Sequence, residues 1–180
     1  MLNNSFFITS TGTNIGKTYC TVEIIKSLIK KKILVKPYKP ILSGFNHKKI
    51  EESDSYKILR TVKKNLDIKD IKSITPWLFN NAIAPSLAAE KENKSLDYNQ
   101  VFNWCFDKIN YKNKKNSINI IEGAGGILVP IEKEKSILDL IIDLKIPVIL
   151  VVGNYLGSVS HTLSVIKNIQ FSKLNIINNN

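Results

Sequence analysis

Hydrophobic and polar positions along the chain follow two alternating patterns. Short runs of β-branched and aromatic residues recur, and longer stretches with apolar residues three or four positions apart separate them. The short runs predict strands at residues 6–9, 33–38, 117–121, 147–152 and 174–177, the strand at 147–152 being fully buried. The amphipathic stretches predict helices that end near residue 31, begin at 53–54, and cover 96–109, 137–144 and 158–170. Because strands that alternate with helices are typical of β-α units, we predict an α/β fold.

We expect this fold to be a single doubly wound domain over residues 1–180, with a mainly parallel sheet flanked by helices. Hydrophobic residues make up 43% of the chain, which is enough to bury a core. The longest apolar stretch, residues 147–153, is far shorter than the roughly 20 residues of a membrane-spanning helix. The first residues show no pattern typical of a signal peptide. We therefore expect a cytoplasmic protein with no membrane partner, and we expect Cys20 and Cys105 to be buried free thiols.

The net charge of +11 raises the possibility of a nucleic-acid partner. Nearly all the basic residues are lysines spread along the chain, and Arg60 is the only arginine. Readout of base sequence relies on arginine side chains that make two hydrogen bonds to one base. The charge is thus more typical of a solvated surface than of a nucleic-acid site, and it would attract anionic substrates.

Residues 9–18, with the sequence TSTGTNIGKT, join the first predicted strand to the first helix. The usual phosphate-loop spacing places a glycine at position 11, but here that position is Thr11 and the glycine is Gly12. The Gly-Lys-Thr ending is intact. Backbone N–H groups at a helix start bind anions, Lys17 can reach the β- and γ-phosphates, and the Thr18 hydroxyl can ligate Mg²⁺. The segment therefore predicts a site for nucleotide phosphates.

Three further polar residues follow predicted strands or begin a predicted helix. Lys39 comes after the second strand, Asp54 begins a helix, and Glu122 follows the strand at 117–121 and precedes three glycines. Taken singly, each has an ordinary interpretation: a surface lysine, a charge at a helix N-terminus, and a flexible turn. The carboxyl ends of parallel strands meet at one edge of the sheet, so we expect all three near the phosphate loop. A carboxylate at position 122 would then face the magnesium ion.

Several segments taken in order resemble the dethiobiotin synthetase family: TGTNIGKT at 11–18, YKPILSG at 38–44, ESD at 52–54, EGAGG at 122–126 and VILVVGNYLGSVSH at 148–161. The resemblance covers residues 6–177. It implies an ATP- and Mg²⁺-dependent cyclo-ligase of biotin biosynthesis, which closes the ureido ring of dethiobiotin from 7,8-diaminononanoate and CO2. The reaction passes through a carbamate and a carbamic-phosphoric anhydride. The resemblance also implies a homodimer and a seven-stranded parallel sheet.

The resemblance assigns roles to individual residues. Lys39 and Lys17 would be catalytic, and the magnesium ligands would be Thr18, Asp54 and Glu122. ATP would be contacted by Asn14, Ile15, Gly16, Lys17, Thr18, Tyr19, Asp54, Glu122, Gly123, Ala124 and Gly125. The diamine would be contacted by Thr13, Ser43, Gly157, Ser158 and Ser160, the last three reaching the partner subunit's site. Two positions depart from the family: Asn14 replaces a glutamate found in many members, and Ser160 replaces an asparagine.

Other P-loop ATPases, of the partition or amide-synthetase type, remain the alternative. Partition ATPases carry a second lysine in the loop, where this chain has Thr11 and Gly12. A small GTPase needs an Asn-Lys-x-Asp motif, and the nearest string, residues 113–116, ends in asparagine. Amidase-coupled synthetases carry a glutaminase domain, for which 180 residues leave no room.

Overall fold

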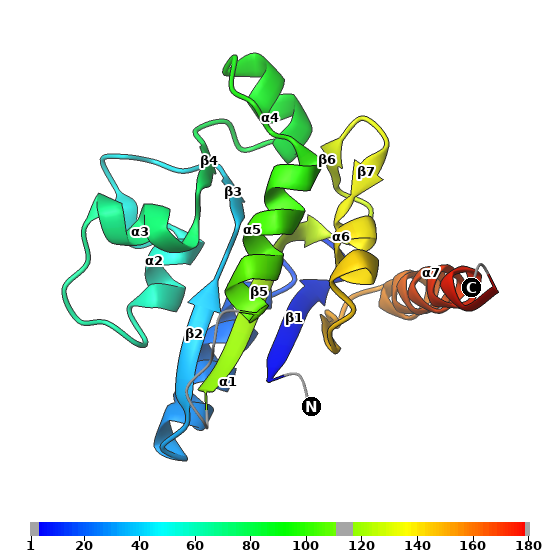
Figure 1. Ribbon diagram of the computed structural model, residues 1–180, viewed down its shortest axis with the longest axis horizontal. Coiled ribbons are helices and arrows are strands. Elements are labelled where there is room, and N and C mark those ends of the chain that lie inside the picture. Colours follow the sequence, from blue (N-terminus) through cyan, green and yellow to red (C-terminus); the bar gives the residue numbers. More distant parts are fainter. Residues whose placement is uncertain (1–3, 111–116, 179–180) are drawn as a thin grey trace.

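The computed structural model describes residues 4–110 and 117–178, and its centre is a parallel β-sheet (Figure 1). Four strands form this sheet in the order β2 (Leu34–Tyr38), β5 (Ser117–Gly126), β1 (Ser5–Ser10) and β8 (Val148–Val151). All three pairings are parallel. The predicted α/β class is confirmed. The described residues place four strands in the central sheet, whereas the family resemblance implied seven.

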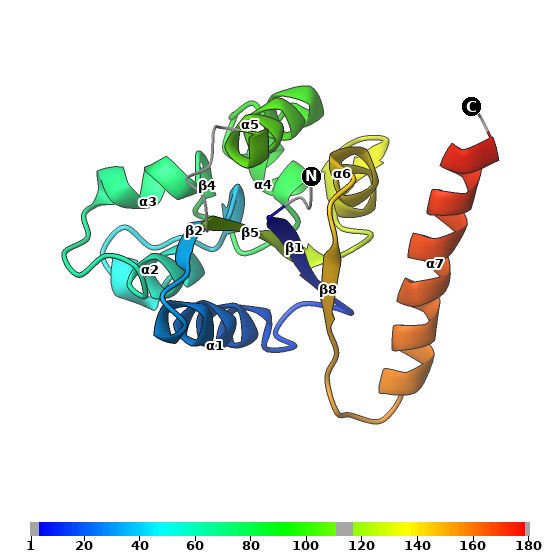
Figure 2. The same ribbon diagram turned by 60° about the horizontal axis from the view of Figure 1, so that its bottom comes forward.

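Helices cover both faces of the sheet. In Figure 2, α1 (Lys17–Lys30) and α2 (Asp54–Leu59) lie on one face, and α5 (Tyr98–Asn110) and α6 (Ile137–Leu144) lie on the other. Successive strand residues point to opposite faces, so neighbours separate into two hydrophobic clusters. Phe7 and Ile121 pack toward α5 and α6, whereas Ile8 and Ile120 pack toward α1. This double coverage explains why the strands have apolar residues at consecutive positions.

Short elements at the carboxyl end of the sheet were not predicted. After β2 the chain forms β3 (Ile41–Ser43), which pairs in parallel with β4 (Trp77–Phe79). A 3-10 turn η1 (Ile50–Glu52) and the helices α3 (Ile68–Ile74) and α4 (Pro85–Lys91) are also unpredicted, and they lie before and after the predicted helix α2. The strands β6 (Pro130–Glu132) and β7 (Lys135–Ser136) form a small antiparallel hairpin before α6. Of these elements, β3 and the start of α4 line the same cavity as the phosphate loop.

Two predictions for the C-terminal third are wrong. Residues 174–177 are not a strand, because α7 runs without interruption over Ser158–Asn178. Glycine and proline, the residues that usually end a helix, are both absent from that range. The strand β8 is not fully buried: it lies at the edge of the sheet beside β1, and Val151 alone among its four residues is buried.

The other predicted elements agree with the structure to within a few residues. Helix α2 begins at Asp54, because the Ser53 hydroxyl accepts a hydrogen bond from the Tyr56 backbone N–H and caps the helix. Both cysteines are free thiols; Cys105 is buried as expected, but Cys20 is only half-buried. The string at 113–116 lies outside the described residues. Among the helices that the structure describes, none has the length and apolar character needed to cross a membrane.

Candidate functional site

The phosphate loop links β1 to α1 through backbone conformations that few residue types adopt. Gly16 is the N-cap of α1 with φ 96°, and Asn14 has φ 60°. Glycine adopts the left-handed region without strain, and asparagine is one of the few other residues that tolerates it. Left-handed residues in such a loop are typical of the backbone nests that bind phosphate. The loop therefore has the local geometry that its sequence predicted.

The loop packs against the end of β5. The Ser10 hydroxyl donates to the Gly12 carbonyl oxygen at 2.6 Å. A Cβ added at Gly126 would lie 3.4 Å from the Gly12 Cα, so the two backbones nearly touch. Gly125 has φ 61°, and a Cβ there would lie 2.7 Å from a methyl carbon of Val129. These glycines meet a packing requirement that a flexible turn would not impose.

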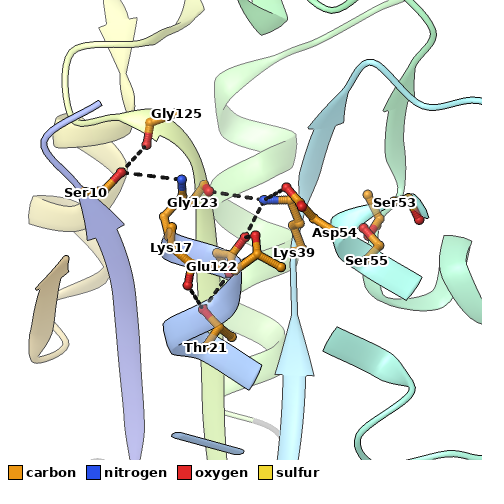
Figure 3. A network of polar contacts seen from close by, with 12 residues as sticks. Ser10, Lys17, Thr21, Lys39, Ser53, Asp54, Ser55, Glu122, Gly123 and Gly125 are labelled. Carbon is orange, nitrogen blue, oxygen red and sulfur yellow. Dashed lines mark hydrogen bonds and ion pairs between the residues drawn. The ribbon is translucent and has the colours of Figure 1, made fainter. Parts of the chain in front are cut away.

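Lys39 and Glu122 lie at the centre of the site (Figure 3). The Lys39 ammonium donates to Glu122 Oε1 at 2.7 Å, and the Thr18 hydroxyl donates to the same oxygen at 2.8 Å. Lys39 Nζ also lies 3.6 Å from the Asp54 carboxylate. Glu122 is fully buried, and burial of a charge is tolerated only when it is paired and hydrogen-bonded. Lys39, Asp54 and Glu122, which are distant from one another in sequence, thus lie together beside the phosphate loop, as expected.

Lys17 is the second buried ammonium of the site. Its Nζ lies 3.5 Å from the Ser10 hydroxyl, and none of the ion pairs in the described part of the chain includes it. Burial lowers the pKa of Lys17, and the neighbouring Lys39 charge lowers it further, whereas Glu122 and Asp54 raise it. Since no carboxylate forms an ion pair with Lys17 among the described residues, its ammonium is available to an incoming anion.

A cavity of about 750 Å³ connects these groups. Its polar lining includes Thr13, Asn14, Gly16, Lys17, Thr18, Tyr19, Lys39, Ser43, Asp54, Ala124 and Gly125, which contribute side chains or backbone. One wall is apolar and includes Ile41, Ile83 and Val129. The Ser43 hydroxyl is buried and has no hydrogen-bond partner within the described residues, so it can bond to a molecule in the cavity.

Some of the predicted site residues do not line this cavity, among them the fully buried Glu122. The Ile15 side chain packs into the core beneath α1, and Gly123 contributes a carbonyl oxygen 3.4 Å from Lys39 Nζ. Gly157, Ser158 and Ser160 lie at the start of α7, outside the cavity lining. Within one chain they are therefore apart from Lys39.

Sequence reasoning missed Thr21, a fully buried residue of α1 whose hydroxyl lies 2.5 Å from Glu122 Oε2. Thr21 follows Lys17 by four residues and Thr18 by three, so all three share one helix face. That helical spacing was the signal that could have revealed it.

A parallel sheet with a phosphate loop and two buried lysines at its carboxyl edge defines a P-loop nucleotide-binding α/β protein. A family model described as an AAA domain matches residues 4–178. The ATP-dependent dethiobiotin synthetase BioD of Methylobacterium nodulans is 32% identical over 167 residues, which are 91% of this chain and 74% of the relative. The protein of the same name from Legionella pneumophila strain Corby is 32% identical over 171 residues, 94% of this chain and 75% of the relative. The chain belongs to the dethiobiotin synthetase family.

Proposed function

We propose that the chain is an ATP-dependent dethiobiotin synthetase, which joins 7,8-diaminononanoate and CO2 into the ureido ring of dethiobiotin. One observation carries the proposal most directly. Lys39, which pairs with the buried Glu122, lines the same cavity as the phosphate loop and Ser43, whose hydroxyl has no hydrogen-bond partner among the described residues. A second lysine beside Lys17 is suited to a reaction in which negative charge develops on phosphoryl and carbamate oxygens together.

The loop residues Asn14 to Tyr19 and the β5 segment Glu122 to Gly125 would bind ATP. Backbone N–H groups at the start of α1 would hold the phosphates, and the Lys17 ammonium would contact the transferred phosphoryl group. Asn14 is uncharged and the loop has no acidic residue, so it places no negative charge near the phosphates.

The donor set fits a magnesium ion. Glu122, Asp54 and Thr18 supply only oxygen atoms, which Mg²⁺ prefers. No group of three or more His, Cys, Asp or Glu residues in residues 4–110 and 117–178 is arranged to hold a metal ion. This agrees with magnesium, which is commonly held by one or two carboxylates together with substrate phosphates and water. When bound, the ion would neutralise phosphate charge and activate the γ-phosphoryl group toward attack.

The cavity accommodates the rest of the substrate. Thr13 and Ser43 would contact the carbamate that forms from one amine and CO2, and the apolar wall suits the alkyl chain. A carbamate oxygen attacks the γ-phosphorus and ADP leaves, giving a carbamic-phosphoric anhydride. The second amine then attacks the carbonyl carbon, which closes the ring and releases phosphate. Lys39 and Lys17 stabilise the oxygen charges, so the protein contributes mainly positioning and electrostatics.

We also propose that the active form is a homodimer in which Gly157, Ser158 and Ser160 contact the diamine in the partner subunit's site. The start of α7 supports this, because a helix N-terminus favours a carboxylate. Leu156 and Val159, which flank it, are large exposed apolar residues. A single domain, a cytoplasmic location and the absence of a nucleic-acid partner remain predictions.

The test is to incubate the protein with ATP, Mg²⁺ and bicarbonate and a panel of amines. Phosphate release should depend on a diamine with neighbouring amines, and mass spectrometry should detect dethiobiotin with 7,8-diaminononanoate. A nonanoate with only one of the two amines is the matched control, because it can form a carbamate but cannot close the ring. Phosphate release that is independent of the diamine would instead support an ATPase of the partition or amide-synthetase type.

A further inference from the structure

The two oxygens of the Glu122 carboxylate have different surroundings. Oε1 accepts hydrogen bonds from Thr18 and Lys39, whose side chains also line the cavity. Oε2 faces α1 and lies 2.5 Å from the Thr21 hydroxyl. Thr21 is fully buried and is not among the residues that line the cavity. The Glu122 carboxylate is therefore held on the α1 side by Thr21, while its other oxygen contacts Lys39 and Thr18, two residues that line the cavity (Figure 3).

The Thr21 hydroxyl has two possible acceptors but only one proton. Its oxygen lies 3.0 Å from the Lys17 carbonyl oxygen and 2.5 Å from Glu122 Oε2. A hydrogen bond from a hydroxyl to a carboxylate is short and stronger than one to a neutral carbonyl group. The bond to the Lys17 carbonyl is the ordinary backward contact of a helical threonine. The carboxylate is the better acceptor and lies closer, so the proton belongs on the bond to Glu122.

We infer that Thr21 is a positioning residue that fixes the Glu122 carboxylate so that Oε1 alone ligates the magnesium ion. This inference rests on the proposed function. The terminal torsion of a glutamate has a broad preference, so a carboxylate without this bond could turn and offer both oxygens. Magnesium requires nearly ideal octahedral geometry, which two oxygens of one carboxylate do not provide. A residue that orients a ligand in this way commonly changes metal affinity when it is removed.

A purely structural role for Thr21 predicts different behaviour. Thr21 fills space between α1 and β5, so a packing role would depend on the volume of its side chain and on its methyl group. Valine keeps the volume and removes the donor, whereas serine keeps the donor and removes the methyl group. The two substitutions therefore separate positioning from packing.

The experiment titrates Mn²⁺, a paramagnetic substitute for Mg²⁺, into the full chain with ADP and follows free Mn²⁺ by electron paramagnetic resonance. Thr21→Val should weaken Mn²⁺ binding by about ten-fold or more, the effect expected when a metal ligand loses its supporting hydrogen bond. Thr21→Ser should bind Mn²⁺ nearly as well as the unmodified protein. ADP binding without metal should be the same in all three proteins.

Thr61→Val is the control, because the Thr61 hydroxyl donates to the backbone carbonyl oxygen of Ile58 and Thr61 does not line the cavity. This variant should bind Mn²⁺ normally. If Thr21→Val does not fold, as judged by circular dichroism, Thr21→Ala is compared with Thr21→Ser, since both lack the methyl group and only serine can donate. The inference is overturned if Thr21→Val binds Mn²⁺ as tightly as the unmodified protein. In the second comparison, it is overturned if Thr21→Ala binds Mn²⁺ as tightly as Thr21→Ser.

The inference and the proposed function fail in distinguishable ways. Unmodified protein that makes dethiobiotin, combined with a donor-free Thr21 variant of normal Mn²⁺ affinity, overturns the inference alone. Unmodified protein that binds Mn²⁺ with ADP but makes no dethiobiotin overturns the proposed reaction alone. Unmodified protein that binds no Mn²⁺ with ADP overturns the inference together with the proposed metal site.

Discussion

Lys39 and Glu122 form an ion pair that is almost completely removed from solvent, with Nζ and Oε1 2.7 Å apart and side-chain exposures of 3% and 0%. The Asp54 carboxylate lies 3.6 Å from the same ammonium on the more exposed side. Lys39 therefore lies between the two carboxylates that we propose as magnesium ligands. A divalent cation bound to both would bring like charges close together in a poorly hydrated site, where they interact strongly. Metal binding and the position of Lys39 are thus coupled.

Lys39→Met should separate the two roles of this ammonium. Turnover should fall by roughly 100-fold, since the loss of one group that stabilises developing charge costs about 3 kcal/mol. Without metal, the variant should also have a lower thermal unfolding midpoint, because removing one partner leaves a buried charge uncompensated. Adding Mg²⁺ with ADP should raise that midpoint more in the variant than in the unmodified protein.

Lys26→Met is the control for Lys39→Met, because Lys26 pairs with Glu23 on the exposed surface of α1. Exposed pairs contribute little to stability, so this variant should be nearly unchanged. Near-normal turnover of Lys39→Met at saturating ATP would remove Lys39 from the catalytic set.

Asp54→Asn tests whether the second carboxylate serves the metal. We expect a several-fold higher Mg²⁺ concentration at half-maximal rate, since an amide is a weaker ligand for a hard cation than a carboxylate. The measurement is the rate at fixed ATP over a magnesium titration. Glu51→Gln, in the exposed turn η1, is the matched control. An unchanged titration would leave Asp54 only as a charge at the N-terminus of α2.

Glu92 links the fold to one wall of the cavity. Its Oε1 accepts hydrogen bonds from the backbone N–H and side-chain amide of Asn81, both at 2.9 Å, and its Oε2 accepts one from Lys94 at 2.7 Å. Asn81 immediately precedes Ala82 and Ile83, which line the cavity. Burial raises the pKa of Glu92, but the hydrogen bonds from Lys94 and Asn81 outweigh it and hold the pKa at about 2.

The folded pKa of Glu92 lies below its ordinary value of 4.5, so its contribution to stability is present above that value and is lost as pH falls toward 2. Glu92→Gln should therefore have a lower free energy of unfolding than the unmodified protein near neutral pH. This difference in free energy should shrink as pH falls from 4.5 toward 2. Urea unfolding at a series of pH values measures it. Glu23→Gln, which removes an exposed carboxylate, is the control; a difference independent of pH would contradict the assignment.

The convergence of Lys17, Lys39 and Glu122 could be predicted because it depends on local pattern and one rule of parallel sheets. Each residue follows a strand that its apolar run marks, and the carboxyl ends of those strands meet at one edge. Thr21 required more information. Its contact with Glu122 depends on β5 lying beside β1 beneath α1, and the strand order is not written in any local pattern.

Residues 41–43, 77–79 and 174–177 show where the sequence pattern did not predict the structure. The strands β3 and β4 have three residues each, too few for an alternation to be recognised. The run at 174–177 has only four residues, and periodicity cannot distinguish a strand from a helix over such a length. Residues 174–177 are helical because they continue α7, which contains no glycine or proline to end the helix.

Ser158, the first residue of α7, lies outside the cavity of its own chain. If the loop before α7 serves the partner subunit's site, the substrate carboxylate would meet backbone N–H groups and hydroxyls at this helix N-terminus. An arginine is not needed for this contact: Arg60, the only arginine of the chain, donates instead to the Lys64 carbonyl oxygen. Ser158→Tyr should therefore raise the KM for the diamine and leave ATP binding intact, whereas Ser164→Tyr, on an exposed turn of the same helix, should change neither.

A mixture of two defective proteins tests the shared site directly. Each Ser158→Tyr/Lys39→Met heterodimer would contain one site with an intact Lys39 and an intact loop, contributed by different subunits. After subunit exchange in equal amounts, half of the dimers are mixed and each has one functional site, so activity should recover to about a quarter of normal. Activity that stays at the average of the two variants, or full activity in a protein that sedimentation shows to be monomeric, would exclude a site shared between subunits.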